Sequence, residues 1–365
     1  MPVRVLYING NIMKRGGIEA FMMNYFRHID QRKVHIDFLV HGYEKGVYDD
    51  EILAAGSHIY HVPTKSKHPI RYQKEVKKLL VEQKFDIIHS HLDAMSGWIL
   101  KIAKQCGVPV RIAHSHNTDH LTTSKLKRMI NDYYKRQIPK HATDLFACSN
   151  AAGKWLFGEN RFLLIPNAVE VDKYLFNKGA REAYRTQYGW EDEFVIGHVG
   201  RFDYQKNQEF IIDILPEVIK KRNNVRVVFV GDGNNLNGIK DRAVSLGVQD
   251  RCSFMGSRED VAELYSAFDL FVLPSRFEGL GIVAVEAQIN GLPCILSDAV
   301  PEEARICKKT YMLSLTDRVS WIDHITNDDQ TRNDAAYTKA MAAKYDISIE
   351  AKTLEEYYVS RVNEI

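Results

Sequence analysis

The first half of the chain alternates short strand-like apolar runs with longer helical stretches. Strands are expected at Val3–Ile8, His35–Val40, His58–Val62, Asp86–Ser90, Val110–His114 and Asp144–Ala147. Helices are expected between them, at Gly17–Ile29, Ile70–Gln83, Ala94–Cys106, Ser124–Ile138 and Ala151–Phe157. This order predicts βαβ units and a mostly parallel sheet.

The pattern breaks around Ile165-Pro166-Asn167-Ala168, and a second series of the same kind follows. Its strands are expected at Phe194–Val199, Arg226–Val230, Cys252–Met255, Leu270–Leu273 and Cys294–Ser297. Its helices are expected at Asn207–Lys221, Leu236–Leu246, Val261–Phe268 and Gly281–Asn290, with a last one at Ile347–Val362. We therefore expect two similar α/β halves with a cleft between them, and such clefts are favoured ligand sites.

The segment Phe277-Glu278-Gly279-Leu280-Gly281-Ile282-Val283-Ala284-Val285-Glu286 carries two glutamates eight residues apart. It follows the strand expected at Leu270–Leu273, and ligands of open α/β sheets bind at the carboxyl ends of strands. The apolar neighbours of Glu286 predict a helix that is packed on nearly all sides. An unpaired carboxylate is costly to bury there, so Glu286 needs a partner, and a ligand with hydroxyl groups is a natural one.

Two cations lie in the turn after the strand expected at Phe194–Val199. A guanidinium such as that of Arg201 grips phosphate oxygens at two points, and the Lys206 ammonium adds a mobile charge, so together they can hold a diphosphate. The alternative is a pair of surface charges without a role. The position at the end of a strand, with Gly200 allowing close approach of a ligand to the backbone, favours a binding site.

Gly16 and Gly17 lie where the first strand turns into the first helix. Glycine lets a ligand touch the backbone and a helix N-terminus attracts phosphate, whereas the alternative is simply a tight turn. Neither this pair nor Gly231-Asp232-Gly233 forms a GxGxxG fingerprint, so a nicotinamide site is poorly supported.

Two histidine pairs, His89/His91 and His114/His116, each end an expected strand. Residues two apart share one face of a strand, so each pair presents two imidazoles together. Imidazole is a common metal ligand. No motif such as HExxH accompanies these histidines, however, which favours structural or hydrogen-bonding roles, and a place at the cleft edge stays open to both pairs.

Composition adds an asymmetry to this picture. The chain has 365 residues, which fits about two domains, and a net charge of +2. Residues 1–170 carry +9 and residues 171–365 carry −7, and twelve of the 14 histidines lie in the first part. A basic domain favours an anionic partner, which can be nucleic acid, a phosphorylated acceptor or a membrane surface.

Cysteine usage and hydropathy indicate a cytoplasmic protein. The five cysteines show no CxxC spacing, which predicts reduced thiols rather than a zinc site or a disulfide framework. No apolar run approaches the roughly 18 residues of a membrane span, and Val5–Ile8 is too short for the core of a signal peptide.

Residues 125–138 interleave basic side chains with apolar ones, and drawn as a helix they form an apolar stripe beside a basic face. One interpretation is a solvated helix that packs on its own domain. The other is peripheral attachment to an anionic membrane, where each Lys or Arg near the surface is worth about 1 kcal/mol.

Together these motifs resemble the group 1 (family 4) retaining glycosyltransferases of GT-B fold, especially the bacterial exopolysaccharide and capsule transferases. The resemblance covers the whole chain and rests on Gly16-Gly17-Ile18-Glu19, Ala113-His114-Ser115-His116-Asn117-Thr118, Ile165-Pro166-Asn167, Gly200-Arg201 with Lys206, Val230-Gly231-Asp232-Gly233, and Glu278 with Glu286. It implies two Rossmann-like parallel-sheet domains facing each other across a cleft. Residues 1–168 would form the acceptor side and 169–345 the nucleotide-sugar side, with 346–365 crossing back as a helix.

The resemblance places the donor in the second domain. Glu286 is expected to bond the ribose hydroxyls, and bonds of this kind to a charged acceptor are typically worth about 1.5–3 kcal/mol. Glu278 and the backbone of Gly279, Leu280 and Gly281 are expected to hold the donor sugar and diphosphate. Arg201 and Lys206 would neutralise the diphosphate as it leaves. Arg258 is near where the family cradles the base.

From the first domain, Gly16 and Gly17 would approach the donor phosphates, and His114 or His116 would face the donor sugar or the acceptor hydroxyl. No nucleophile is evident, so the implied mechanism is front-face substitution with retention, in which the departing diphosphate oxygen takes the acceptor proton. The candidate catalytic residues are Glu278, His116, His114, Arg201 and Lys206. No metal ion and no other cofactor is expected. Ala168 replaces the glycine usual in the family after Pro166-Asn167, which puts only the linker geometry in doubt.

The resemblance implies transfer of a sugar from a nucleotide-sugar, a UDP-sugar by family frequency, to a lipid-diphosphate-linked or saccharide acceptor. The basic first domain motivates the lipid-linked acceptor and contact with an anionic membrane at the inner face of the cell membrane; no nucleic acid is expected. One alternative is a sugar-nucleotide epimerase of similar two-domain fold, which would need no acceptor. Another is an inactive transferase-like binding partner, which the intact set Arg201, Lys206, Glu278 and Glu286 disfavours.

Overall fold

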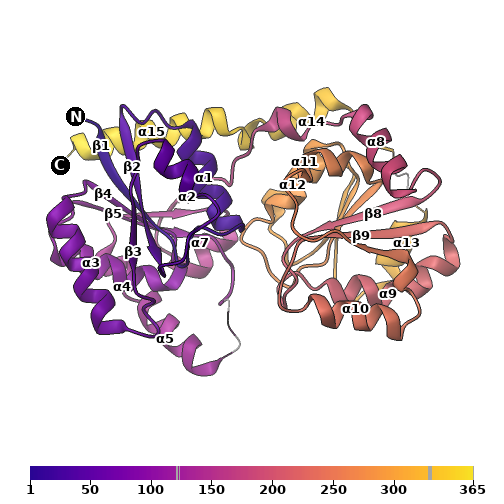
Figure 1. Cartoon of the computed structure of the whole chain (residues 1–365), viewed down its shortest axis with the longest axis horizontal. Coiled ribbons are helices and arrows are strands. Elements are labelled where there is room, and N and C mark those ends of the chain that lie inside the picture. The colour runs from indigo at the N-terminus through magenta and orange to yellow at the C-terminus, as the bar shows by residue number, and fades with distance from the viewer. Residues whose placement is uncertain (121, 123, 328–330, 365) are drawn as a thin grey trace. The chain divides into compact units, whose positions relative to one another are not determined.

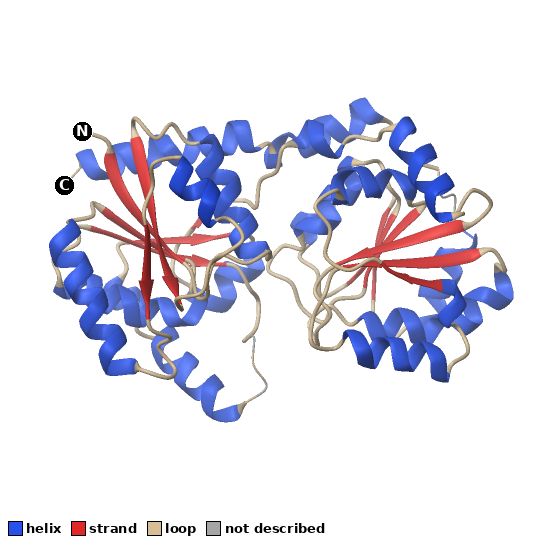
Figure 2. Cartoon of the chain, in the orientation of Figure 1, coloured by secondary structure: helices blue, strands red, loops and turns tan. Residues whose placement is uncertain are grey.

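The computed structural model describes residues 1–120, 122, 124–327 and 331–364, and it divides into two compact units. Unit 1 comprises Met1–Val169 and Tyr345–Ile365, and unit 2 comprises Glu170–Lys344. Each unit is a parallel β-sheet flanked by helices (Figure 1, Figure 2). The expected α/β fold with two Rossmann-like parallel sheets is confirmed.

The unit 1 sheet has the strand order β3-β2-β1-β4-β5-β6-β7, with every neighbouring pair parallel. Its strands are β1 (Val3–Ile8), β2 (Val34–His41), β3 (Ile59–Val62), β4 (Ile87–Ser90), β5 (Val110–Ser115), β6 (Asp144–Ala147) and β7 (Leu163–Leu164). The order reverses between β1 and β4. In doubly wound sheets ligands bind outside the carboxyl ends of the strands at this reversal.

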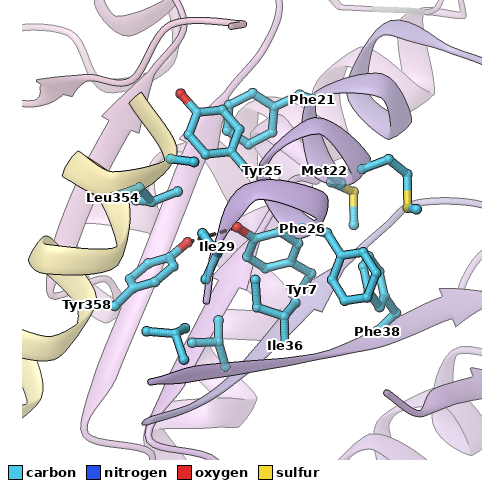
Figure 3. Close-up of a cluster of buried hydrophobic side chains, with 14 of the residues drawn as sticks. Tyr7, Phe21, Met22, Tyr25, Phe26, Ile29, Ile36, Phe38, Leu354 and Tyr358 are labelled. Carbon is cyan, nitrogen blue, oxygen red and sulfur yellow. Dashed lines mark hydrogen bonds between the residues drawn. The ribbon is translucent and has the colours of Figure 1, made fainter. Parts of the chain in front are cut away.

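The helices of unit 1 are α1 (Gly17–His28), α2 (Asp49–Ala54), α3 (Pro69–Gln83), α4 (Ser96–Gln105), α5 (Lys125–Lys135), α6 (Ile138–His141), α7 (Asn150–Phe157) and α15 (Ile347–Asn363). The C-terminal helix α15 completes a core of this unit, because Leu354 and Tyr358 pack with Tyr7 of β1 and the aromatic face of α1 (Figure 3). Phe21, Tyr25 and Phe26 supply that face.

The unit 2 sheet repeats the pattern, with the order β10-β9-β8-β11-β12-β13 and parallel neighbours throughout. Its strands are β8 (Phe194–Val199), β9 (Val225–Val230), β10 (Cys252–Phe254), β11 (Leu270–Leu273), β12 (Cys294–Ser297) and β13 (Thr310–Leu313). The reversal falls between β8 and β11. Every residue of those two strands is buried, as expected for parallel strands covered on both faces.

The helices of unit 2 are α8 (Lys178–Tyr188), α9 (Gln208–Lys221), α10 (Leu236–Ser245), α11 (Val261–Leu264), α12 (Ile282–Ile289), α13 (Arg318–Asn327) and α14 (Ala335–Ala342). The sequence interpretation missed α8, α13, α14 and β13 in this unit, and α2 and β7 in unit 1. In α8 only Arg185 is buried and in β13 only Thr310, so neither carries a strong apolar pattern. None of the helices in the described part of the chain is long and apolar enough to cross a membrane.

Two expected helices are shorter than predicted. The one expected at Ser124–Ile138 ends at Lys135, and α6 begins at Ile138 with Pro139 in its first turn, where proline is tolerated. The one expected at Val261–Phe268 is α-helical only to Leu264 and continues as a 3-10 turn, Tyr265–Ala267.

Candidate active site

The loops after β8 and β11, the two strands at the reversal of the unit 2 sheet, bring Lys206 and Glu278 together. Lys206 Nζ lies 2.7 Å from Glu278 Oε1, and the two side chains are only 16% and 6% exposed. Ser275 Oγ donates to the same oxygen at 2.6 Å. The predicted diphosphate-binding lysine and the predicted catalytic glutamate therefore form one nearly buried ion pair.

Side-chain amides and glycines give these loops their shape. Gln205 Nε2 donates to Phe277 O at 3.1 Å, which ties the β8 loop to the β11 loop. A Cβ on Gly200 would stand 3.1 Å from Lys206 Cδ, so glycine leaves room for the lysine stem. Gly281 precedes α12 with φ of +81°, a left-handed conformation that favours glycine.

Gly231 has a packing role in this arrangement. A Cβ there would come within 2.2 Å of Gly200 O, so the end of β9 requires glycine to lie against the β8 loop. Gly233 is equally constrained, because its Cβ would meet Phe202 O at 2.4 Å. The two glycines of Gly231-Asp232-Gly233 are thus explained by contacts between loops.

Arg201 lies on the same loop as Lys206, but its side chain is largely exposed to solvent. Its side chain is 63% exposed, and its Nε lies 2.6 Å from Asp203 Oδ2. The other Asp203 oxygen accepts the backbone N–H of Lys206 at 3.0 Å. Asp203 thus holds both predicted diphosphate ligands, one by its side chain and one by its backbone.

Glu286 lies on a partly accessible strip of α12, where the sequence predicted a helix packed on nearly all sides. Ile282, Val283 and Glu286 are only partly buried and share one face. The Tyr265 hydroxyl donates to Glu286 Oε2 at 2.9 Å, so a tyrosine supplies a partner that the sequence assigned to a ligand. Burial raises the pKa of Glu286, against the lowering influence of the Tyr265 and Tyr174 hydroxyls.

Arg258 lies apart from this pair of loops. Its guanidinium forms a two-point ion pair with Asp260, with Nε 2.7 Å from Oδ1. Its Nη1 donates to the Tyr188 hydroxyl of α8 at 3.3 Å. The structure therefore brings Arg258 against α8 and not into contact with the Lys206–Glu278 pair.

In unit 1, Gly16 and Gly17 begin α1. A Cβ on Gly16 would stand 2.5 Å from Glu19 Oε2, because the Glu19 side chain folds back over the first turn from the third helical position. Asn9 Nδ2 donates to Glu19 Oε1 at 3.0 Å. No described heavy atom outside its neighbours lies within 4 Å of a Cβ built on Gly17, so this glycine faces open space.

The four predicted histidines form two bonded pairs across β4 and β5. His89 Nε2 lies 3.0 Å from His114 Nδ1, and the two rings are almost parallel, at 5°. His91 Nδ1 lies 2.9 Å from His116 Nε2. Neighbouring rings along each strand lie 4.1–4.2 Å apart, so the two pairs stack on each other.

The first pair ends a longer hydrogen-bonded chain. His89 Nδ1 lies 2.6 Å from the Tyr358 hydroxyl of α15. That hydroxyl is 3.2 Å from the Tyr7 hydroxyl (Figure 3). A neutral imidazole has one donor and one acceptor nitrogen, so the direction of the His89–Tyr358 bond fixes that of the His89–His114 bond. The chain stops at His114 Nε2, which is buried and has no hydrogen-bond partner among the described residues.

All four imidazoles are neutral in this environment. Burial lowers the pKa of His89, His91 and His114 well below the usual value, and that of His116 to about 3. Nitrogens of His89, His91 and His114 lie within 4.8 Å of one another, close enough to share a metal ion. The nitrogens of His89 are taken up by His114 and Tyr358, however, so we assign no metal ligands here.

His114 and His116 occupy different positions. His114 lies inside β5 with its ring fully buried, whereas His116 follows the strand and is 6% exposed. Phe21 of α1 lies against both, with ring centroids 4.8 Å and 5.1 Å away. Sequence reasoning missed three residues that bond predicted site residues: Tyr358 bonds His89, Tyr265 bonds Glu286 and Ser275 bonds Glu278. Tyr358 is 269 residues from its partner, and none of the three carries a motif of its own.

Helix α5 presents its apolar stripe outward. Leu126, Met129, Ile130 and Tyr133 are exposed, and no residue of the helix is fully buried. At the edge of this stripe, one turn beyond Ile130, Tyr134 stacks on Trp98 with ring centroids 5.4 Å apart and attaches the helix to unit 1. The interpretation as a helix packed on its own domain therefore accounts for Tyr134 but not for the exposed stripe.

Two family models match the chain in succession. The model described as Glycosyltransferase Family 4 matches residues 15–173, and the one described as Glycosyl transferases group 1 matches residues 180–329. EpsF of Bacillus subtilis (strain 168), which is named as a glycosyltransferase, is 36% identical over 309 residues that cover 82% of this chain and 80% of EpsF.

Two further comparisons extend this likeness. The Escherichia coli UDP-Gal:alpha-D-GlcNAc-diphosphoundecaprenol alpha-1,3-galactosyltransferase is 28% identical over 273 residues, 70% of each chain. Among solved structures, HepE of Anabaena in complex with UDP and glucose superposes with a TM-score of 0.80 at 19% identity, over 97% of this chain and 99% of HepE. At that identity the likeness concerns the fold.

Proposed function

The chain belongs to the group 1, family 4 glycosyltransferases of GT-B fold, and we propose that it is a retaining enzyme that moves a sugar from a UDP-sugar to a lipid-diphosphate-linked or saccharide acceptor in exopolysaccharide or capsule biosynthesis. The observation that carries the proposal is the Lys206–Glu278 pair at the strand reversal of unit 2. That is where doubly wound sheets bind their ligands.

A nearly buried ion pair is a weak source of stability, because removing two charges from water offsets most of their attraction. The pair between Lys206 and Glu278 is therefore better explained by a ligand that replaces it. A sugar diphosphate would offer Lys206 a phosphate oxygen and leave Glu278 to accept hydroxyl groups of the sugar. Arg201, already exposed beside them, would add a second cation to the diphosphate.

The nucleoside would lie along the partly accessible strip of α12. Glu286 would accept bonds from the ribose hydroxyls, with Tyr265 holding its other oxygen in place. Arg258 remains the candidate for the base, and its guanidinium would then contact the base from its present pair with Asp260. Gly17, whose Cβ position faces open space, supports the approach of donor phosphates to the start of α1.

In the proposed mechanism the bond between the sugar C1 and the diphosphate oxygen breaks as the acceptor oxygen bonds C1 on the same face. The acceptor proton passes to the departing diphosphate oxygen. Lys206 and Arg201 stabilise the charge that develops there, which is where fixed charges lower a barrier most. Of the two candidate histidines we favour His116 as the one that contacts the sugar. His116 lies just beyond the carboxyl end of β5, whereas His114 lies within the strand and bonds His89.

The donor base and the acceptor follow from the comparisons only as proposals. HepE was solved with UDP and glucose, and the E. coli relative is named for a UDP-galactose donor and a diphosphoundecaprenol-linked acceptor. The exposed apolar stripe of α5, beside Lys125 and Lys127, supports contact of unit 1 with an anionic membrane that holds such an acceptor. We propose no metal and no further cofactor.

A panel of nucleotide-sugars scored by thermal shift would test the donor, since a ligand that binds only the folded state raises apparent stability. The donor that stabilises the protein is then incubated with a polyprenyl-diphosphate sugar, and the product linkage is read by NMR. The expected product retains the donor's anomeric configuration, and EDTA leaves the rate unchanged. An epimerised nucleotide-sugar without acceptor would show an epimerase, and calorimetry without nucleotide binding would show an inactive binding partner.

A further inference from the structure

Asp93, three residues beyond the end of β4, has a left-handed backbone. Its φ is +46°, a conformation that most side chains avoid and that Asp and Asn adopt more readily than others. The residue opens a 3-10 turn, Asp93–Met95, which contacts β5, α4 and α5. Such a backbone persists where its surroundings hold it in place, so the contacts of Asp93 are informative.

The carboxylate of Asp93 spans the loop that follows β5. Oδ1 accepts the backbone N–H of His116 at 2.7 Å, and Oδ2 accepts Asn117 Nδ2 at 2.7 Å. Both partners are buried. Hydrogen bonds to an ionised acceptor are roughly twice as strong as neutral ones, so one carboxylate fixes two successive residues where the chain leaves the sheet.

We propose that Asp93 is a positioning residue for sugar transfer, whose ionised carboxylate holds His116 at the carboxyl end of β5. The inference rests on the proposed function, because it takes His116 as the histidine that faces the sugar. Asp93 acts through the His116 backbone and the Asn117 side chain. A displacement of about 1 Å at such a group can cost roughly 100-fold in rate, which is why one bond matters.

The Asp93 clamp consists of the two hydrogen bonds that the Asp93 carboxylate accepts from the His116 N–H and from Asn117 Nδ2, and its strength depends on pH. Burial raises the pKa of Asp93 to about 6, while the bonds from His116 and Asn117 and the nearby His120 lower it. A protonated carboxyl turns an O–H toward one of its two donors, so one bond weakens as the pH falls below about 6.

The effect on stability has the opposite sign. Because the folded-state pKa of Asp93 lies above its unfolded value, protonation between about pH 6 and pH 4 favours the folded state. Activity and stability are thus expected to change in opposite directions over that range, which a general acid-induced loosening of the fold would not produce.

Other titratable groups surround the turn. On the elements packed against it and in the adjoining loops they include His91 after β4, His114 in β5 and His116 after it, Asp119 and His120 in the following loop, and Lys125, Lys127, Arg128, Asp132 and Lys135 on α5. Asp119 pairs with Arg128 at 3.0 Å, and His120 Nε2 lies 2.9 Å from Asp132 Oδ1. Lys101 and Lys104 of α4 act on His141 instead.

Histidine-selective NMR of the full chain tests the clamp without any substrate. Since the pKa of the His116 ring is about 3, its own titration lies far below pH 6. An inflection of the His116 ring signals near pH 6 is expected from its neighbour Asp93. Asp93→Asn, which keeps the left-handed preference but cannot ionise, is expected to remove it. A wild-type protein without the inflection, or an Asn variant that keeps it, would overturn the proposal.

Turnover supplies the second readout. Wild-type kcat is expected to fall as the pH drops through about 6, which gives the pH profile an acid limb. Asp93→Asn is expected to lower kcat roughly 10- to 100-fold at pH 8 and to show no such acid limb. Wild-type turnover in Asp93→Asn at pH 8 would refute the role. If His116→Ala stays fully active, or the wild type transfers no sugar, the proposed function fails instead, while the NMR result still decides whether the clamp exists.

Two companion variants keep the test decisive if Asp93→Asn does not fold. Asn117→Ala removes one donor to the carboxylate and is expected to move the His116 inflection to higher pH; an unmoved inflection would count against the clamp. Asp119→Asn removes the same charge two residues beyond Asn117, where the carboxylate accepts the His120 N–H instead. Asp119→Asn is expected to keep both the His116 inflection and the fall of kcat at acid pH. If this variant lost them, Asp119 rather than Asp93 would be the group that titrates, which would overturn the proposal.

Discussion

Lys206 and Glu278, 72 residues apart in the sequence, meet at 2.7 Å between two loops of unit 2. The glutamate carboxylate also accepts the Ser275 hydroxyl, and Gln205 Nε2 lies 3.4 Å from its second oxygen. Both members of the pair are thus held in place before any ligand arrives. Preorganised charges of this kind need no reorganisation when a leaving group develops charge, which is how they lower a barrier.

Replacing Lys206 or Glu278 by alanine is expected to abolish transfer in a protein that still folds. Loss of the ammonium removes stabilisation of the departing diphosphate, which is worth about 100-fold or more in kcat for a well-placed group. The remaining charge is left nearly buried without its partner, which lowers the free energy of unfolding by about 3–5 kcal/mol. Steady-state kinetics and urea unfolding measure the two effects.

A matched control is Lys221→Ala in the same unit. Lys221 pairs with Asp323 at 2.6 Å, but both side chains are about half exposed, and such surface pairs contribute about 0–1 kcal/mol. Turnover and stability are expected to stay near the wild-type values. Wild-type turnover in Lys206→Ala or Glu278→Ala would remove the catalytic roles proposed for the pair.

Glu286→Gln is expected to weaken nucleotide binding roughly 10- to 150-fold, the loss that corresponds to about 1.5–3 kcal/mol for bonds to a charged acceptor. The wild type should bind more weakly as the pH falls through the raised pKa of Glu286, because the protonated form accepts fewer bonds. Its stability changes the other way, since the ionised group is the one that burial disfavours. Calorimetry with UDP over a pH series measures the affinity.

The ribose assignment has its own control in the ligand. 2′,3′-Dideoxy-UDP, which lacks both ribose hydroxyls, is expected to bind wild type and Glu286→Gln with similar affinity, and with little pH dependence. If Glu286→Gln lowered the affinity for UDP and for its dideoxy analogue equally, Glu286 would not contact the ribose.

Tyr358→Phe is expected to destabilise unit 1 by about 1–3 kcal/mol, because it leaves the buried His89 and Tyr7 without the hydroxyl between them. Tyr72→Phe is the matched control. Its hydroxyl is equally buried but has no hydrogen-bond partner among the described residues, so its removal is expected to be neutral or stabilising. Hydrogen exchange of unit 1 amides in the two variants separates these outcomes, and equal effects would contradict the hydrogen-bonded chain.

The fold could be predicted because its central strands are unambiguous in the sequence. Strands such as β8 and β11 are buried on both faces and read as continuous apolar runs, with glycines where the loops turn. Helix α8 could not be predicted in the same way, because it buries only Arg185, which reaches Asp269 at 3.0 Å. Its stability comes from tertiary contacts rather than from an apolar stripe.

In the candidate site, too, some residues could be predicted from local sequence and others could not. The positions of Lys206 and Glu278 in loops after strands, and of Glu286 on the helix that follows, can be predicted from local pattern. Partners far away in the sequence cannot: the hydroxyl that meets His89 belongs to Tyr358, 269 residues away. Such contacts depend on the three-dimensional arrangement of elements. A single sequence contains the side chains but no signal that joins them.

The exposed stripe of α5 leads to the last prediction. Leu126, Met129 and Tyr133 lie on one side of the helix and are 56–69% exposed, which is unusual for apolar side chains spaced on one helix face. Replacing all three by serine is expected to weaken binding to anionic liposomes, because their insertion at the interface contributes apolar burial. Co-sedimentation with phosphatidylglycerol vesicles measures the loss.

The contacts of the basic side chains on and beside α5 show which of them are exposed and can be tested for membrane binding. Arg128 is paired with Asp119 and Lys135 lies over the Trp155 ring, which leaves Lys125, Lys127 and Arg136 exposed. Neutralising these three is expected to reduce liposome affinity by about 3 kcal/mol at low salt, at about 1 kcal/mol each. The control neutralises the three exposed lysines Lys67, Lys74 and Lys78 around α3. Because net charge changes equally in both, an equal loss of binding would show a diffuse electrostatic effect, and unchanged co-sedimentation of the α5 variants would exclude α5 as the membrane contact.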